Sequence, residues 1–323
     1  MRFWQLFTRS IFIVLIMVML SLASHPVDAL TTATPASQPL ILVWQTATTP
    51  DAVLDRPVDI AVDEQGNIYV NQQAEKHIKK FDKDGKYVMQ WGSTGVGEGQ
   101  LSLPGGIAVD SDGNIYAGDF STMRILKFDS DGKFLMQWST EPPAGPGGIA
   151  VDKDGNVYND NFGTHEHYMQ KFDRNGKLVT QWGTTGKDDG QFGASENGGA
   201  EDVTIDKDGN IYVADRLNQR IQKFDADGKF LAKFGGNGES FLPSGVAVDG
   251  QGNIYAVDTL NYFMRKLDSK GNTLAQWPIR GNELDGISLI AVDWDGNIYV
   301  YAHPKTATGG ISERFVVKKF KRP

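Results

Sequence analysis

The sequence predicts an all-β fold in which six repeated units close into a ring. An apolar triplet ending in Asp, followed three residues later by Gly-Asn-apolar-Tyr, occurs six times, at Asp63, Asp110, Asp152, Asp206, Asp249 and Asp293. These Asp residues are 47, 42, 54, 43 and 44 residues apart. A period of about 40 to 50 residues made of short strands is typical of a propeller with one blade per copy. The last copy lacks a strand that the start of the chain can supply. We therefore expect a six-bladed β-propeller of four-stranded antiparallel blades, closed by an N-terminal strand that completes the last blade.

The first two strands of each unit flank the motif turn. The run at residues 60–63 is continuously apolar up to Asp63, as expected of a strand buried on both faces. Its middle position suits the crowded centre of the ring, because it is always small: Ala61, Ala108, Ala150, Thr204, Ala247 and Ala291. In the Asp-x-x-Gly-Asn turn, Asp can accept backbone bonds and Gly can adopt a positive φ. The second strand follows at Asn-apolar-Tyr.

The third and fourth strands carry recurring aromatic residues. The third strand ends in Phe81, Phe128, Phe172, Phe224, Leu267 and Phe320 in the six copies. After a second tight turn, the fourth strand carries one large aromatic residue: Trp91, Trp138, Trp182, Phe234 and Trp277. Because these aromatics recur so regularly, we expect them to pack between blades rather than to stack on a ligand.

The sixth copy stops after its third strand, at residues 315–321. Residues 40–44 match residues 87–91 of the first copy, with Trp44 aligned to Trp91. We therefore expect the N-terminal segment to pair into the last blade. Such closure would remove an exposed sheet edge without a disulfide.

Residues 1–29 are expected to form a signal peptide, with cleavage near residue 23 or 29. Arg2 and Arg9 flank its start, and residues 11–22 are apolar apart from Ser21, which is short for a membrane span. Residues 30–39 are expected to be a flexible leader, and residues 40–323 the propeller. The sequence thus predicts export to the periplasm or the extracellular space. Retention of the segment would instead give an N-terminal membrane anchor.

Composition excludes several functional classes. The net charge of −8 argues against binding to nucleic acid or to anionic membranes. The chain has no Cys, which excludes disulfides, thiolate metal sites and a Cys nucleophile. The Asp-x-Asp-Gly turns do not have the spacing of an EF-hand calcium loop.

Loop lengths indicate which face of the ring binds. From the Tyr of the second strand to the end of the third, the distances are 12, 12, 14, 12, 12 and 21 residues. The links between blades also vary, whereas the turns on the opposite face have constant length. Because loops that depart from a repeat template tend to carry function, we expect the variable face to be the binding face.

Four His residues fall on this variable face: His77, His165, His167 and His303. Neutral imidazole is a good metal ligand, and alternate residues on an extended segment point the same way. His165, His167 and His303 are therefore the candidate ligands of a divalent metal. The alternative is that they are ordinary surface His residues in polar loops.

Other candidate binding residues are acidic, basic or aromatic. Asp59 and Asp202 precede the first strand in their copies and should lie near the mouth of the central channel, where they could bind a cation or satisfy loop amides. Glu201 and Arg216 belong to neighbouring variable segments. Aromatic residues in these loops could contact a partner, as they do in interface hot spots: Phe120, Phe162 and Tyr262.

The repeats resemble NHL repeats, most clearly in residues 209–225 (GNIYVADRLNQRIQKFD) and 243–255 (PSGVAVDGQGNIY). The resemblance covers residues 40–322. It implies a six-bladed propeller that acts mainly as a binding module for protein or RNA. The chain looks like an exported, bacterial-type member without a RING or kinase domain, so ubiquitin-ligase activity is not implied. The charge and the export signal disfavour RNA.

The blade pattern is also similar to that of peptidyl-hydroxyglycine amidating lyases, which hold zinc through His at the head of the first strand. None of the matching positions is His: Val58, Gly105, Gly147, Glu201, Ser244 and Ser288. A calcium-dependent lactonase would need a ring of Asn, Asp and Glu around the channel, for which only Asp59 and Asp202 qualify.

Two hypotheses therefore remain. The first is a secreted or periplasmic non-catalytic scaffold that holds a protein or a small polar ligand on the variable face and requires no cofactor. The second is a metal-dependent hydrolase or lyase of the propeller type, which would use a divalent metal. Contact with a membrane is expected only if the N-terminal segment is retained.

Overall fold

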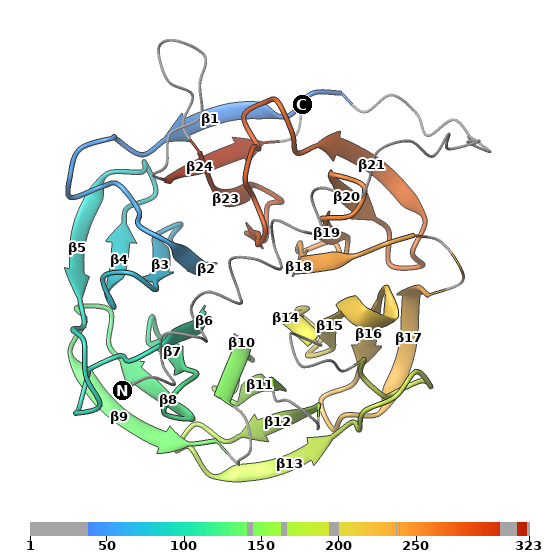
Figure 1. Ribbon diagram of the computed structural model, residues 1–323, viewed down its shortest axis with the longest axis horizontal. Coiled ribbons are helices and arrows are strands. Elements are labelled where there is room, and N and C mark those ends of the chain that lie inside the picture. The colour runs from blue at the N-terminus through green and yellow to red at the C-terminus, as the bar shows by residue number, and fades with distance from the viewer. Residues whose placement is uncertain are drawn as a thin grey trace, which may run out of the picture. The chain divides into compact units, whose positions relative to one another are not determined.

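Each repeat forms one four-stranded antiparallel sheet, and the sheets stand around a common axis in the computed structural model (Figure 1). The structure describes residues 38–140, 145–162, 167–193, 200–236, 238, 240–303 and 315–321, all within one compact unit that spans residues 35–323. In this part of the chain there are six such sheets. The predicted six-bladed β-propeller is therefore confirmed.

The first five blades each use four consecutive strands, numbered from the axis outward. Blades one to three contain β2 (Pro57–Val62), β3 (Ile68–Gln72), β4 (Ile78–Phe81) and β5 (Tyr87–Trp91); β6 (Pro104–Val109), β7 (Ile115–Asp119), β8 (Arg124–Phe128) and β9 (Phe134–Ser139); and β10 (Gly145–Val151), β11 (Val157–Phe162), β12 (Tyr168–Phe172) and β13 (Leu178–Trp182). Blades four and five contain β14 (Ala200–Ile205), β15 (Ile211–Asp215), the 3-10 turn η1 (Arg216–Asn218), β16 (Arg220–Phe224) and β17 (Phe230–Gly235); and β18 (Pro243–Val248), β19 (Ile254–Asp258), β20 (Phe263–Leu267) and β21 (Thr273–Pro278).

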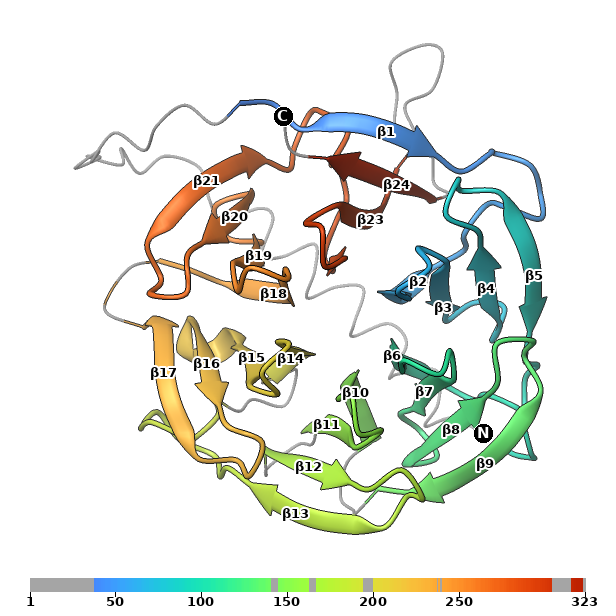
Figure 2. The ribbon, with the colours of Figure 1, turned by 180° about the vertical axis from the view of Figure 1, so that it is seen from behind.

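The sixth blade joins the two ends of the described chain. Its sheet has the order β22 (Ala291–Val292), β23 (Ile298–Ala302), β24 (Val316–Lys321) and β1 (Ile41–Gln45). Both views show β1 as the outermost strand beside β24 (Figures 1 and 2). The predicted closure by an N-terminal strand is thus confirmed.

The repeated motif is explained by its hydrogen bonds. Asp63 Oδ1 accepts the Asn67 backbone N–H at 2.7 Å, and Asp63 Oδ2 accepts the Asn67 amide at 2.8 Å and the Tyr69 hydroxyl at 3.0 Å. Gly66 has a φ of 82°, a conformation that favours Gly. The same Tyr-to-Asp bond recurs in the other repeats through Tyr116, Tyr158, Tyr212, Tyr255 and Tyr299. Each bond ties the second strand back to the end of the first.

The fourth-strand aromatics pack between blades, as predicted. The Trp91 ring lies 6.3 Å from that of Tyr69 in its own blade and 6.2 Å from that of Phe128 in the next. It also covers Gly132 in the next blade, where an added Cβ would lie 2.7 Å from the indole. Trp138 and Trp182 make the corresponding contacts. These aromatics therefore belong to the core.

The register of β1 differs from the expected alignment of Trp44 with Trp91. Trp91 pairs with Ile78, but the equivalent position opposite Val317 is held by Thr46, whose N–H donates to the Val317 carbonyl at 2.9 Å. The alignment was therefore wrong by two residues. A shift of two keeps every side chain on the same face of a strand. Trp44 consequently still faces inward, and its Nε1 donates to the Lys83 carbonyl in the first blade at 3.1 Å.

The expected signal peptide, residues 1–29, lies outside the described residues, as does most of the expected leader. Among the residues that the structure describes, no helix is long and apolar enough to cross a membrane.

Candidate functional site

Two cavities lie along the axis, one at each face of the ring. The variable-face cavity, at the second-to-third-strand loops and the inter-blade links, has a volume of about 350 Å³. The turn-face cavity, at the constant-length turns, has a volume of about 450 Å³. Asp59 and Asp202 line both cavities, so these two carboxylates stand at the level where the two cavities meet.

The variable-face cavity is built from the starts of the innermost strands. Side chains of β2, β6, β10, β14 and β18 reach it where these strands begin at the axis. Most of its wall is apolar or glycine, including Leu103, Pro104, Gly105, Gly106, Phe120, Pro146, Gly147, Gly148 and Leu289. Its polar groups are those of Asp59, Gln73, Asp160, Asp202, Ser244 and Ser288. The result is an apolar wall around a small number of acidic and hydroxyl groups.

Asp59 and Asp202 each join two blades. Asp59 accepts the N–H of Ile60 in its own strand at 2.7 Å and the N–H of Ile107 in the next blade at 2.8 Å. Asp202 does the same with Val203 and Val246, each at 2.8 Å. Both oxygens of each carboxylate are therefore used to satisfy strand amides, which is one of the two roles expected from the sequence.

The buried position of these carboxylates changes their ionisation. Burial raises the pKa of Asp59 to about 7, although the two backbone N–H bonds act in the opposite direction. Burial and the nearby charge of Asp59 raise the pKa of Asp202 well above its ordinary value. At neutral pH the axis therefore holds carboxyl groups that can carry a proton.

Asp160 is a third acidic group at this end of the channel, and it was not expected from the sequence. It is buried on β11, and its Oδ1 accepts the Gly148 N–H at 2.5 Å. The charge of Asp160 also raises the pKa of Asp202. Comparison of the repeats could have found it, because the same column otherwise holds Asn71, Gly118, Ala214, Val257 and Tyr301.

The described His residues lie in three different blades. His77 Nδ1 is 4.0 Å from Glu75 Oε2 in the first blade, and His167 is buried in the third. The His303 ring packs on Phe315 in the sixth blade, with centroids 4.0 Å apart. His165 lies outside the described residues. Within the described ranges, no group of three or more His, Cys, Asp or Glu side chains could hold a metal ion.

Among the other candidates whose side chains the structure describes, only Phe120 joins Asp59 and Asp202 in lining the variable-face cavity. Arg216 lies half-buried in η1. Tyr262 is exposed, and the Arg280 guanidinium lies 3.2 Å from its ring centroid. The side chains of Phe162 and Glu201 are outside the described part of the structure.

The positions compared with the zinc ligands of the amidating lyases do converge. Val58, Gly105, Gly147, Ser244 and Ser288 all line the variable-face cavity. These positions at the head of the first strand therefore lie together at the variable-face end of the axis. In this chain that ring carries small and hydroxyl side chains.

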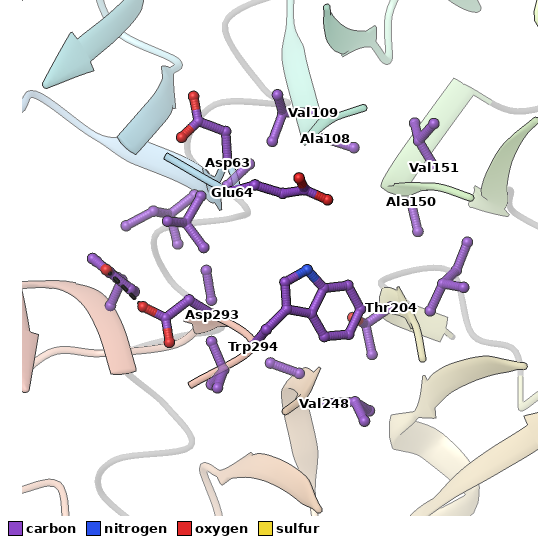
Figure 3. A pocket seen from close by; sticks show the side chains of 18 of the residues that line it. Asp63, Glu64, Ala108, Val109, Ala150, Val151, Thr204, Val248, Asp293 and Trp294 are labelled. Carbon is purple, nitrogen blue, oxygen red and sulfur yellow. Dashed lines mark hydrogen bonds between the residues drawn. The ribbon is translucent and has the colours of Figure 1, made fainter. Parts of the chain in front are cut away.

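The turn-face cavity has a different character. Polar turn residues form its edge, and below them its wall consists mainly of small and β-branched residues of the innermost strands, such as Ala108, Val109 and Val151. Figure 3 shows Glu64 and Trp294 extending from the edge of this cavity into the space between the strands. Neither residue was expected from the sequence, although Trp294 stands in a turn position that holds Glu64, Ser111, Lys153, Lys207 and Gly250 in the other repeats.

Comparison with known proteins supports the fold. The family model of the SMP-30/gluconolactonase/LRE-like region matches residues 50–189, and that of the NHL repeat matches residues 198–224. A search of curated proteins found no significant match.

The solved structures that resemble this chain include two lyases. One is a streptogramin B lyase, with a TM-score of 0.60 and 15% identity over 87% of this chain and 97% of that one. Another is a catalytically inactive virginiamycin B lyase from Staphylococcus aureus with quinupristin, with a TM-score of 0.61 and 13% identity over 88% and 100% of the two chains. Hydrazine synthase from Kuenenia stuttgartiensis has a TM-score of 0.58 and 15% identity over 83% of each chain. At these identities the likeness shows the fold alone. The six four-stranded blades, their repeated motif and the two family matches together identify the chain as an NHL-repeat β-propeller.

Proposed function

We propose that this protein is a secreted or periplasmic binding scaffold without catalytic activity. It holds a small polar ligand or a protein partner on the variable-loop face, with the variable-face cavity as the centre of the site. Nucleic acid is not the partner, because the chain carries a net charge of −8. Contact with a membrane would require the N-terminal segment to be retained.

The variable-face cavity is the observation that carries this proposal. Its volume of about 350 Å³ lies in the range of small-molecule sites. Such sites are mostly apolar and orient the ligand with a few polar groups. Here Phe120 and Leu103 offer apolar contact, while Gln73 and Ser288 offer hydrogen bonds at the wall. A ligand with an apolar body and one polar end fits this arrangement.

The hydrogen bonds of the axial carboxylates favour binding over catalysis. Each oxygen of Asp59 and Asp202 already accepts a backbone N–H. These carboxylates are therefore held in place as parts of the ring. The described His residues, which are the most versatile acid–base groups, are distributed over three blades rather than gathered at the cavity.

One observation favours the second hypothesis, a hydrolase or lyase. Burial raises the pKa of Asp59 to about 7, the value that suits a general acid or base at neutral pH. The match to the SMP-30/gluconolactonase/LRE-like model points the same way. In this alternative a divalent metal would assist the reaction.

A thermal-shift screen with amines, amino acids, dipeptides and polyols tests the proposal. We expect compounds that raise the melting temperature of the wild type to lose this effect in Phe120→Ala and Gln73→Ala. Leu135→Ala, which removes an exposed side chain from the outer strand β9, is the control and should respond like the wild type. The site is contradicted if no compound in the screen loses its stabilising effect in Phe120→Ala or Gln73→Ala.

Two further measurements separate the scaffold from the enzyme. Mass spectrometry of each stabilising compound after incubation should return it unchanged, and elemental analysis should find no stoichiometric metal. Turnover of a compound, lost in Asp59→Asn, would establish the enzyme instead. Intact-mass analysis of protein recovered from the periplasm or the medium should show a chain beginning after residue 23 or 29.

A further inference from the structure

The turn-face cavity has features that the proposed function does not use. It is the larger of the two axial cavities, at about 450 Å³, and its edge carries Trp294. That side chain is 46% exposed, although Trp is usually buried to a large extent. The five other Trp residues on the strands are core or half-buried residues that pack between blades. An exposed indole at the edge of a cavity of this size is available to contact a ligand.

The position of Trp294 is fixed by its backbone. It lies in the motif turn between Asp293, which accepts the Asn297 amide at 2.7 Å, and Gly296. The Trp294 carbonyl accepts the Gly250 N–H of the fifth blade at 3.2 Å. A Cβ at Gly250 would lie 2.6 Å from this carbonyl oxygen, so only Gly permits the approach. The neighbouring blade thus makes room for the turn that presents the indole.

The charges around the indole are acidic. Glu64 in the adjacent first blade and Asp295 beside Trp294 are both exposed carboxylates at the cavity edge. Two of the three lysines that line this cavity are already engaged, because Lys83 pairs with Asp84 at 2.8 Å and Lys319 lies 5.0 Å above the Tyr299 ring. The third, Lys153, belongs to the third blade, whereas Trp294 and Glu64 belong to the sixth and first blades. The remaining field near Trp294 therefore attracts a positive charge.

Between its edge and the carboxylates of Asp59 and Asp202, the channel is lined mainly by apolar side chains. Its walls are the small residues of the innermost strands, among them Ala108, Ala150, Val151 and Val248, which Figure 3 shows around the space that Trp294 enters. Between the level of Asp59 and that of Asp63 the strand rises by roughly 13 Å, from four residues at about 3.3 Å each. A short aliphatic chain can therefore enter the channel from the edge.

We propose that the turn-face cavity is a second binding site, which takes a small organic cation with an aliphatic chain. The cationic group lies against the face of the Trp294 indole and beside the Glu64 carboxylate. Aromatic faces attract quaternary ammonium groups, and the carboxylate adds a charge of opposite sign. The aliphatic chain extends into the channel between the Ala and Val side chains. This site lies at the opposite face from the variable-face cavity and does not depend on the function proposed for it.

Isothermal titration calorimetry with pentyltrimethylammonium tests the proposal. We expect Trp294→Ala to weaken binding about tenfold and Glu64→Gln about threefold or more. Both side chains are exposed, so these variants should keep the wild-type melting temperature. Lys207→Gln is the matched control, because Lys207 holds the same turn position in the fourth blade and is not among the lining residues. It should bind within about twofold of the wild type.

Two other probes define the chemistry. Tetramethylammonium, which lacks the chain, should bind more weakly than pentyltrimethylammonium, and pentyl sulfate, which reverses the charge, should not bind. The proposal is overturned if the wild type fails to bind the cation at millimolar concentration. It is also overturned if pentyl sulfate binds with the affinity of the cation, or if Trp294→Ala binds the cation like the wild type. Phe120→Ala should leave this binding unchanged, so failure here is distinguishable from failure of the variable-face site.

Discussion

At the scale of single residues, Asp59 shows how one side chain serves both the fold and the site. Its two oxygens accept N–H groups from Ile60 and from Ile107, which belong to different blades. The same carboxylate lines both axial cavities. A substitution at this position should therefore change stability and its pH dependence together.

Asp59→Asn should destabilise the protein and flatten its pH dependence. The amide group would face the Ile107 N–H with a donor, and an unsatisfied buried N–H costs about 1–3 kcal/mol. Burial raises the pKa of Asp59 from 3.8 to about 7. Between these pH values the folded protein binds a proton that the unfolded chain has released, so wild-type stability falls as the pH rises from about 4 to 7.

Urea unfolding at pH 4.5 and pH 7.5 measures this effect. The variant lacks the Asp59 contribution, and loss of the Asp59 charge also lowers the pKa of Asp202. The difference in unfolding free energy between wild type and variant should therefore shrink at the higher pH. An equal difference at both pH values would contradict the assignment.

Replacing individual Trp residues by Ala should lower the free energy of unfolding by amounts that follow the burial of each ring. Trp91→Ala should cost about 3–5 kcal/mol, because its buried ring fills the space between two blades. Trp44→Ala should cost less, since the Trp44 ring is only half-buried at the edge of the sixth blade. Trp294→Ala should change stability by less than about 0.5 kcal/mol. Chemical denaturation of the three variants checks the order, and a Trp44 cost above that of Trp91 would be inconsistent with it.

At the scale of elements, the outer strand β1 closes the ring. It pairs with β24, and Thr46 exchanges two hydrogen bonds with Val317, at 2.9 and 3.1 Å. The Gln38 carbonyl accepts the Trp277 Nε1–H of the fifth blade at 2.9 Å, so the segment also spans two blades. Without this segment, β24 would be left as an unpaired edge strand.

Deletion of residues 39–46 should therefore abolish soluble folding. The expected result is aggregated protein without a cooperative melting transition, because an open edge invites pairing between chains. A synthetic peptide of residues 38–46, added during refolding, should restore part of the soluble yield. A soluble deletion variant with the wild-type melting temperature would show that closure does not depend on β1.

The inter-blade link before the fourth blade depends on Arg220. Its Nε donates to Asp215 Oδ2 at 2.8 Å, and its guanidinium donates to the carbonyls of Asp188 and Gln191. Arg220→Met should lower the free energy of unfolding by about 3–5 kcal/mol, because the buried Asp215 carboxylate loses its ion-pair partner. Lys233→Met is the matched control, since Lys233 pairs with Asp189 at the surface and should cost at most about 1 kcal/mol. Equal costs in thermal unfolding would refute the role of the link.

At the scale of the whole molecule, the sequence predicted the ring better than the sites. The six motif copies determine the number of blades, because each copy supplies the Asp, Gly and Tyr that build one hairpin. The register of β1 was wrong by two residues, since alternation of side chains has period two and cannot distinguish such a shift. Asp59 and Asp202 were correctly expected to reach the channel, but they lie within β2 and β14 and at the level where the two cavities meet rather than at the mouth.

The roles of the other site residues could not be predicted, because they depend on contacts that form only in the folded ring. Asp160 is notable through its contact with Gly148 and its effect on Asp202. Trp294 lies in a turn of constant length, on the face opposite the one that was expected to bind. The face with constant turns nevertheless holds the larger cavity. Loop length therefore predicted a binding site at one end of the axis only.

The central claim is that the axis of this closed ring binds ligands and that the variable-face cavity is the principal site. A crystal structure of the protein soaked with a compound from the thermal-shift screen tests it most directly. The account predicts density for the compound at the variable face, in contact with Phe120 and above the carboxylates of Asp59 and Asp202. Density confined to the outer strands of the blades, with the variable-face cavity empty, would contradict it.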